Sequence, residues 1–114
     1  MLSKEEITAK AVELGVKYDT TITPIVFTDK KTGEQVIGYL KELDNYQVAM
    51  HAVGRMLNNA IEEGAEAILR ACLILNESSP RILSNDKKDI SIRVSAVLAC
   101  IPMLELYAEE YKKK

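Results

Sequence analysis

The residues best suited to catalysis or metal binding are one histidine and two cysteines, His51, Cys72 and Cys100. A Cys–His pair can supply a nucleophile and its base, and both residue types bind zinc. Each cysteine stands singly within an apolar helical pattern, however, and His51 has no nucleophile beside it in the sequence. Because zinc sites draw on closely spaced pairs of ligands, we expect two core cysteines, a surface histidine and no metal site.

The sequence also lacks clear candidates for acid–base catalysis and for phosphate binding. Glu62 and Glu66 lie four residues apart, as do Glu105 and Glu109, but both pairs fall on the polar sides of predicted helices. A catalytic pair of carboxylates needs an environment that separates the two pKa values. The glycines lack the spacing of a dinucleotide or phosphate loop. We therefore expect no cofactor and no enzymatic activity.

Length and charge exclude further classes of protein. A chain of 114 residues corresponds to one domain, residues 1–114. Its 15 basic and 17 acidic residues give a net charge of −2, which argues against a polybasic nucleic-acid binder. The apolar run 94–104 is short of the roughly 20 residues that span a membrane, and residues 1–6 lack the apolar core of a signal peptide. We expect a soluble cytoplasmic protein with no nucleic-acid or membrane partner.

The elements that would position these residues begin with a helix and a hairpin. Ser3 and Glu6 form a capping-box pattern ahead of an apolar helical stripe, and Gly15 favours the end of that helix. Residues 22–27 and 36–40 read as two strands joined by a polar turn. Pro24 lacks an N–H group, which predicts an edge strand. Because both faces of this hairpin carry apolar residues, helices or a partner chain must cover them.

Three helices are predicted after the hairpin. Asp44 is the expected N-cap of the first, and Asn58-Asn59 predicts a break before the second. The last helix runs from about residue 88 to 111, with a kink at Pro102. Its apolar residues at alternating spacings of four and three predict a packing seam. The seam comprises Ile90, Val94, Val97, Ile101, Leu104, Ala108 and Tyr111.

The predicted fold class is therefore α+β, with an N-terminal helix, one β-hairpin and a bundle of about three helices ending in a long C-terminal helix. A domain of this size leaves about a third of its surface exposed, so some of its many apolar residues are expected to form a protein-binding surface. The residues favoured for that surface are Tyr39, Tyr46, Met50, Met56 and Arg81. For Arg81 the alternative is a structural ion pair with Glu77.

Three stretches resemble small phage and prophage proteins that act as tail assembly chaperones. They are Thr-Gly-Glu-Gln-Val-Ile-Gly-Tyr-Leu-Lys-Glu at 32–42, Gly-Ala-Glu-Ala-Ile-Leu at 64–69 and Asn-Glu-Ser-Ser-Pro-Arg-Ile at 76–82. The resemblance covers most of the chain from about residue 23. It implies a non-enzymatic α+β protein that binds the tape-measure protein, or another tail component, in the cytoplasm of the bacterial host cell. The partner would be shielded by apolar contacts until tail-tube subunits displace the chaperone.

The sequence leaves two alternatives open. One is a structural virion or prophage protein that forms a homo-oligomer by hairpin pairing. The other is a small ligand-binding module, which would require a deep pocket that holds His51 together with Cys72 or Cys100.

Overall fold

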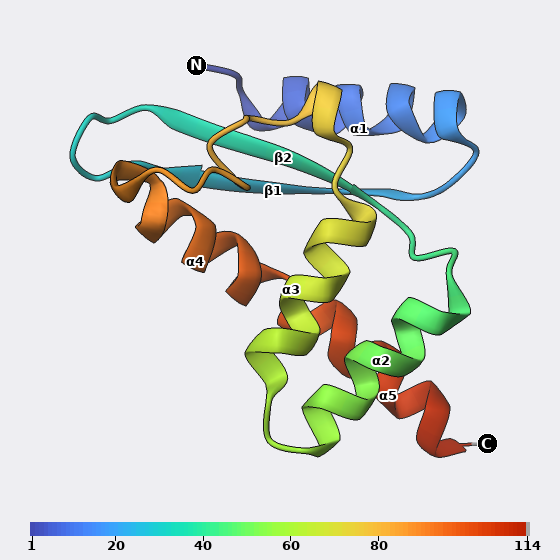
Figure 1. Ribbon diagram of the computed structural model, residues 1–114. Helices are drawn as coiled ribbons and strands as arrows, with labels where there is room; N and C mark the ends of the chain where they lie inside the picture. Colours follow the sequence, from blue (N-terminus) through green and yellow to red (C-terminus); the bar gives the residue numbers. More distant parts are fainter. Residues whose placement is uncertain (114) are drawn as a thin grey trace. The chain divides into compact units, whose positions relative to one another are not determined.

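The computed structural model describes the backbone of residues 1–113 and the side chains of residues 1–109. Within it the chain forms α1 (Lys4–Tyr18), β1 (Ile22–Thr28), β2 (Gln35–Lys41), α2 (Tyr46–Leu57), α3 (Ile61–Cys72), α4 (Ile90–Ala99) and α5 (Ile101–Lys113). Two short 3₁₀ turns, η1 (Leu75–Glu77) and η2 (Lys87–Asp89), lie between α3 and α4. Figure 1 shows these elements, and they confirm the predicted α+β class with its single hairpin and long helical C-terminal stretch.

The elements divide into two compact units. The first comprises residues 1–42 and 73–93, and the second comprises residues 43–72 together with the chain from residue 94. The first unit holds α1 and the hairpin, while α2, α3 and α5 belong to the second.

In the first unit, α1 begins at the predicted capping box. The side chain of Ser3 accepts a hydrogen bond from the Glu6 N–H at 3.1 Å, and Glu6 accepts one from the Ser3 N–H at 3.0 Å. The helix was predicted to end at Gly15, but it continues for about one more turn and ends at Tyr18. Asp19 then adopts a left-handed conformation, with φ of 52°, and its N–H caps the Gly15 carbonyl. Gly15 instead permits close approach, since a Cβ there would lie 2.9 Å from the Thr20 carbonyl oxygen.

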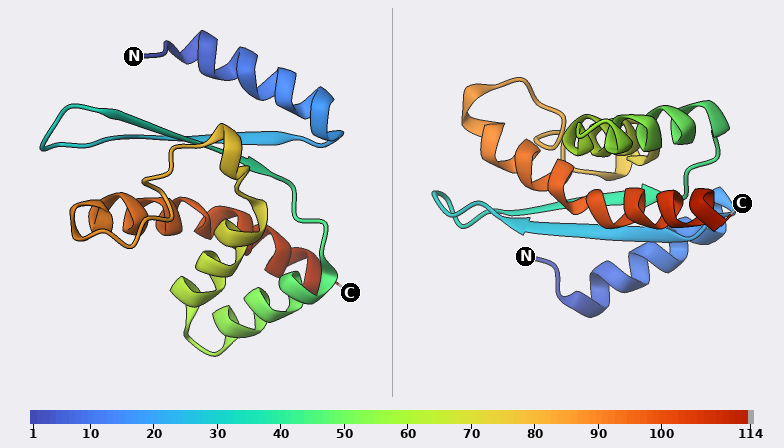
Figure 2. Two further views of the ribbon diagram at one scale, coloured as in Figure 1. Left: turned by 45° about the horizontal axis from the view of Figure 1, so that its top comes forward. Right: turned by 90° about the horizontal axis from the view of Figure 1, so that it is seen from below.

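Helix α1 packs on one face of the hairpin, as Figure 2 shows. The buried cluster between them comprises Ile7, Ala11, Leu14, Ile22, Tyr39 and Ile74. The opposite face includes Gly38, where a Cβ would lie 2.7 Å from Ile82 and 3.1 Å from Leu73. Residues 73–82 of this chain therefore cover the face that was expected to need a helix or a partner.

The two edges of the hairpin differ. Along β2, Ile74 N–H donates to the Tyr39 carbonyl at 2.9 Å and Ser79 N–H donates to the Ile37 carbonyl at 2.8 Å. Their partners in β1 are Pro24 and Val26, which by antiparallel alternation direct their backbone polar groups to the other edge. Among the described residues β1 pairs only with β2, so Pro24 lies on an open edge, as its missing N–H predicted.

In the second unit, α2, α3 and α5 pack against one another. Asn45, and not Asp44, caps α2, because its side chain accepts from the Val48 N–H at 3.2 Å. The predicted break after α2 is confirmed: the helix ends at Leu57, and Asn59 has φ of 63°. Close packing of α2 and α3 requires Gly64, since a Cβ there would lie 2.5 Å from the Ala52 carbonyl oxygen.

The C-terminal helical stretch is interrupted at Cys100, between α4 and α5, which confirms the predicted disturbance by Pro102. Its predicted seam is wrong in the first half. Ile90 is 58% exposed and Val94 is 51% exposed, whereas the fully buried stripe repeats every four residues. That stripe comprises Ile92, Ala96, Cys100, Leu104 and Ala108, while the side chain of Tyr111 lies outside the described residues. Because this helix is apolar all round, periodicity alone does not choose its buried face.

Candidate protein-binding surface

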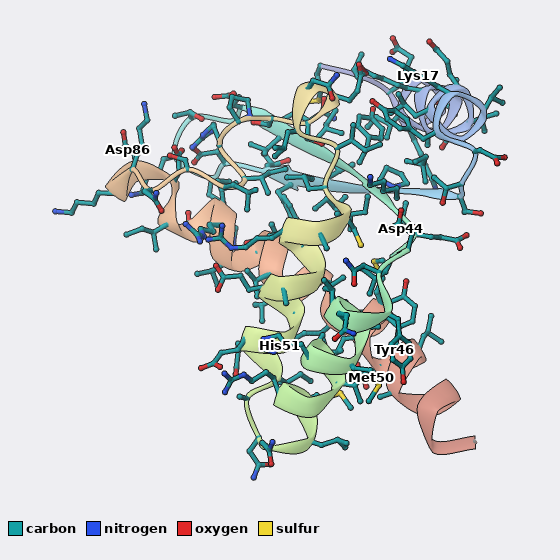
Figure 3. The ribbon with its side chains drawn as sticks, turned by 45° about the vertical axis from the view of Figure 1, so that its right-hand side comes forward. Lys17, Asp44, Tyr46, Met50, His51 and Asp86 are labelled. Carbon is teal, nitrogen blue, oxygen red and sulfur yellow. The ribbon has the colours of Figure 1, made fainter. Side chains whose placement is uncertain are left out.

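An exposed apolar surface lies along α2 in the second unit. Tyr46, Met50, Gly54 and Leu57 are spaced by four, four and three residues, which places them on one side of the helix. Tyr46 is 74% exposed and Leu57 is 52% exposed, while Met50 is half-buried. Figure 3 shows Tyr46 and Met50 on one side of α2 and His51 on the other. We call these four residues the α2 surface.

Gly54 is the residue of this surface that the fold itself does not explain. It lies in the interior of α2, yet a Cβ at this position would meet no atom within 4 Å. Glycine in a helix interior costs about 0.5–1 kcal/mol relative to alanine. Gly64, by contrast, is required by the contact between α2 and α3. The open space next to Gly54, on the same side of α2 as Tyr46 and Met50, leaves room for another backbone to approach the helix closely.

The ionisable residues of α2 itself are basic. The sequence of α2 contains His51 and Arg55 and no acidic residue. Arg55 lies 3.5 Å from Glu63 at the start of α3, and both side chains are about half exposed or more. Such an exposed pair holds the arginine weakly. Arg55 lies nine residues from Tyr46, which places it on the opposite side of the helix from that residue, so the α2 surface itself carries no charge.

Met56 does not belong to the α2 surface. It lies three residues from Val53 and four from Ala52, the two buried residues of α2, and is itself half-buried. Its helical position places it on the side of α2 that faces the core of the unit. Of the residues predicted to form a surface on α2, the structure thus brings together Tyr46 and Met50 and separates Met56 from them.

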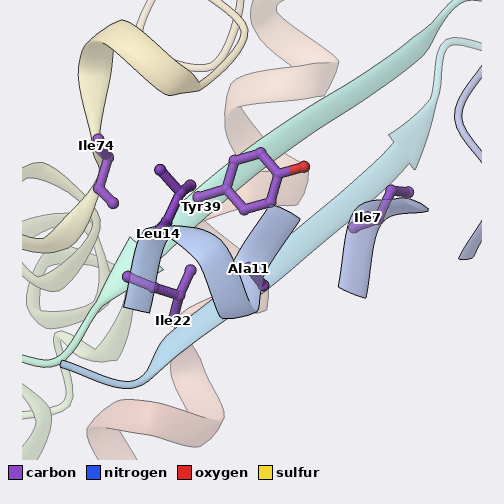
Figure 4. Close-up of a cluster of buried hydrophobic side chains, with 6 residues drawn as sticks. All are labelled: Ile7, Ala11, Leu14, Ile22, Tyr39 and Ile74. Atoms are coloured by element: carbon purple, nitrogen blue, oxygen red, sulfur yellow. The ribbon is translucent and has the colours of Figure 1, made fainter. Parts of the chain in front are cut away.

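Tyr39 is buried, with 1% of its surface exposed, and therefore does not present a surface to a partner (Figure 4). Burial raises the pKa of its hydroxyl group, which has no hydrogen-bond partner among the described residues. The ammonium group of Lys10 lies 5.5 Å from the ring centroid. The alternation of side chains along β2 allowed Tyr39 to lie on either face of the hairpin. In the structure it lies on the face that α1 covers.

Arg81 is held by three carboxylates in the first unit. Its Nε donates to Asp89 Oδ1 at 2.6 Å, its Nη2 to Asp29 Oδ2 at 2.7 Å and its Nη1 to Glu34 Oε2 at 3.2 Å. The hydrogen bonds from the guanidinium lower the pKa of both Asp29 and Asp89. The predicted partner Glu77 instead pairs with Lys10, at 3.2 Å. Arg81 thus ties the hairpin turn to η2, and its donor groups are engaged within the fold.

The residues considered for catalysis lie in different environments. Cys72 and Cys100 are fully buried in the second unit, as predicted, while His51 is exposed on α2. Burial, with a smaller contribution from Cys72, raises the pKa of the Cys100 thiol to about 12. Among the side chains of residues 1–109, no group of three or more His, Cys, Asp or Glu residues is arranged to hold a metal ion. A ligand-binding module would require a deep pocket that holds His51 with Cys72 or Cys100, and the clefts at α1, at Arg81 and at the N-terminus have none of these residues in their linings.

A groove of about 660 Å³ lies in the first unit, between α1 and the start of β1. Val12 and Val16 from α1 and Pro24 from β1 contribute apolar atoms to it. Its volume falls within the usual range for small-molecule sites, about 300–1,000 Å³. Its lining contains a single ionisable residue, Asp19.

Comparison of the chain with protein-family models, with curated proteins and with solved structures gave no match.

Proposed function

We propose that this chain is a non-enzymatic, tail assembly chaperone-like protein of a phage or prophage. Its α2 surface would bind a tail component, such as the tape-measure protein, in the cytoplasm of the bacterial host. The observation that carries the proposal is the exposed apolar face of α2, which contains a glycine, Gly54, with open space beside it. The class of partner comes from the sequence resemblance of residues 32–42, 64–69 and 76–82.

The α2 surface suits a helical partner segment. An apolar partner helix lying along α2 would contact Tyr46, Met50 and Leu57, which extend over three turns. Gly54 would let the two backbones approach closely at the middle of the contact. Methionine adapts its side chain to different partners, and tyrosine supplies a large apolar area with a polar end.

In this proposal the chain acts by occupying apolar surface and not by chemistry. Binding removes the partner's exposed apolar residues from water, which prevents them from associating with one another. Tail-tube subunits would then displace the chaperone by covering the same residues with a larger interface.

The alternative of a virion protein assembled through its hairpin edge is less well supported. The open edge of β1 has Pro24 at an outward-directed position. A proline there removes one hydrogen bond from any added strand, which is a common protection against edge-to-edge pairing.

The experiment is a binding assay with the tape-measure protein encoded in the same phage or prophage genome. The variant Tyr46→Gln/Met50→Gln should bind at least roughly thirtyfold more weakly, because central apolar contacts each contribute more than about 1 kcal/mol. The matched control is Val12→Gln/Val16→Gln, which likewise replaces two apolar residues one helical turn apart, both of them exposed. Circular dichroism would establish that both variants are folded. Equal binding by the two variants would refute the role of the α2 surface, and binding lost only in the control would move the site to α1.

A further inference from the structure

The groove between α1 and the start of β1 has a buried apolar floor and an exposed apolar rim. Ala11 and Ile22, both in its lining, belong to the buried cluster shown in Figure 4. Val12 and Val16, one helical turn apart on α1, also line it and are 65% and 81% exposed. The groove therefore continues the apolar core of the first unit outward to the surface.

The open edge of β1 runs beside this groove. Pro24, which lines the groove, pairs with Tyr39, whose backbone N–H and C=O groups bond on the side away from β1. By antiparallel alternation Ile22, Pro24 and Val26 direct their backbone polar groups to the open edge. Their side chains share the face of the hairpin that α1 covers. A strand added at this edge would therefore direct every second side chain toward α1.

One end of the groove is acidic. Asp19 is exposed, is the single ionisable residue of the lining, and forms no ion pair among the described residues. It caps the C-terminus of α1, which is the negative pole of the helix dipole. Neither Lys17 nor Lys41 lines the groove. A basic group is the charge that complements this end.

We propose that the groove binds an extended peptide, which adds to β1 as an antiparallel strand and carries a basic residue near its C-terminal end. One peptide residue exchanges two hydrogen bonds with Val26. Two residues further along, an apolar side chain opposite Pro24 packs against Val12 in the groove. Two residues beyond that, opposite Ile22, a lysine or arginine reaches Asp19. In strand addition of this kind, main-chain hydrogen bonds supply affinity and alternate side chains supply specificity.

The length of the groove matches such a peptide. Its lining on the side of α1 extends from Thr8 to Asp19, which lies eleven residues later, or about 16 Å at 1.5 Å per residue. Five residues of a strand cover about the same distance, at roughly 3.3 Å per residue. Five residues are also what pairing with β1 from Ile22 to Val26 requires.

A second copy of the chain is a less suitable occupant of this edge. Pairing two β1 strands about a two-fold axis would bring the second α1 to the same face of the sheet, where it would compete for the groove. Each of the two strands would also lack the N–H of its Pro24. A separate peptide loses one hydrogen bond only, and the apolar side chain that it places in the groove offsets that loss.

Titration of the isotope-labelled chain with the peptide acetyl-Thr-Val-Thr-Val-Thr-Lys-amide, followed by the backbone amide signals, tests the proposal. Saturable shifts are expected in α1 and β1. Val12→Gln/Val16→Gln should weaken binding roughly tenfold, because two apolar contacts are lost. The matched control is Tyr46→Gln/Met50→Gln on α2, which should bind the peptide as the unmodified chain does. Absence of saturable binding, or equal affinity in both variants, would overturn the proposal.

Two altered peptides test the strand addition and the acidic end. N-methylation of the first valine, which pairs with Val26, should abolish binding, and unchanged affinity would overturn strand addition. Replacing the peptide lysine with glutamate should weaken binding about twofold to thirtyfold. Asp19→Asn keeps a residue that tolerates the left-handed conformation and should bind both peptides alike. A preference for lysine that is absent, or that survives in Asp19→Asn, would overturn the assignment of the acidic end.

Discussion

The Nε atom of Arg81 lies 2.6 Å from Oδ1 of Asp89, a buried carboxylate that is 3% exposed. The same guanidinium also bonds to Asp29, which follows β1, so one side chain joins two segments that are 52 residues apart. Removing the guanidinium would leave carboxylates with little access to water and no cation beside them. This contact is therefore a principal link between the hairpin turn and η2 within the first unit.

Replacing Arg81 tests that link. Arg81→Met retains most of the side-chain volume but removes every donor, so the free energy of unfolding at pH 7 should fall. Arg81→Lys should recover only part of the loss, because one ammonium group cannot reproduce the planar fork that contacts Asp29 and Asp89 together. Urea denaturation followed by circular dichroism measures the difference. Unchanged unfolding midpoints in both variants would contradict the assigned role.

Acid should weaken the same contacts. The pKa values of Asp29 and Asp89 are lowered in the folded state, chiefly by their hydrogen bonds to Arg81. A lowered folded-state pKa contributes stability that is fully present above the unfolded value, about 3.9 for aspartate, and is lost as the pH falls toward the folded value. Stability should therefore decline below about pH 4. The deficit of Arg81→Met relative to the unmodified chain should shrink over the same range. A constant deficit between pH 7 and pH 3 would contradict the assignment.

The two glycines of the helical unit should respond oppositely to alanine. Gly64→Ala should destabilise the fold by about 1–3 kcal/mol, because its Cβ would meet the backbone of Ala52. Gly54→Ala should stabilise the fold by about 0.5–1 kcal/mol, because the surrounding space is open. Thermal unfolding of both variants checks the signs. If Gly54 admits a partner backbone, Gly54→Ala should also weaken binding of the tape-measure protein while raising stability.

Tyr39 offers a test of buried polarity. Its hydroxyl group is buried without a hydrogen-bond partner among the described residues, and an unsatisfied buried polar group costs about 1–3 kcal/mol. Tyr39→Phe should therefore leave the free energy of unfolding unchanged or raise it by up to about 1 kcal/mol. A loss of more than about 1 kcal/mol in urea denaturation would show that the hydroxyl group is hydrogen-bonded in solution.

The elements set by local chemistry could be predicted from the sequence, and those set by tertiary packing could not. The Ser3–Glu6 capping box, the break at Asn58-Asn59 and the edge position of Pro24 follow from backbone preferences of single residues. The partners of Arg81 follow from chain segments meeting in space. An arginine after a turn indicates an ion pair, but the sequence does not show which of the many carboxylates is its partner.

The candidate surface shows the same division. The apolar positions Tyr46 and Met50 could be selected from the sequence. Tyr39 and Met56 could not be assigned to the buried side before α1 and the core of the second unit were known. In the last helix the spacing of four and three predicted a seam through Ile90 and Val94, whereas the packing selected the side that contains Cys100. Gly54 was missed because a helix-interior glycine looks like a weakness until the empty space around it is seen.

The α2 surface is tested most directly by oxidative footprinting of the chain with and without the tape-measure protein. Methionine oxidation depends on access to solvent, and Met50 is half-buried in the α2 surface while Met1 is 94% exposed and distant in sequence. The account predicts that the partner slows oxidation of Met50 and leaves Met1 unchanged. Formation of the complex with no protection of Met50 would contradict it.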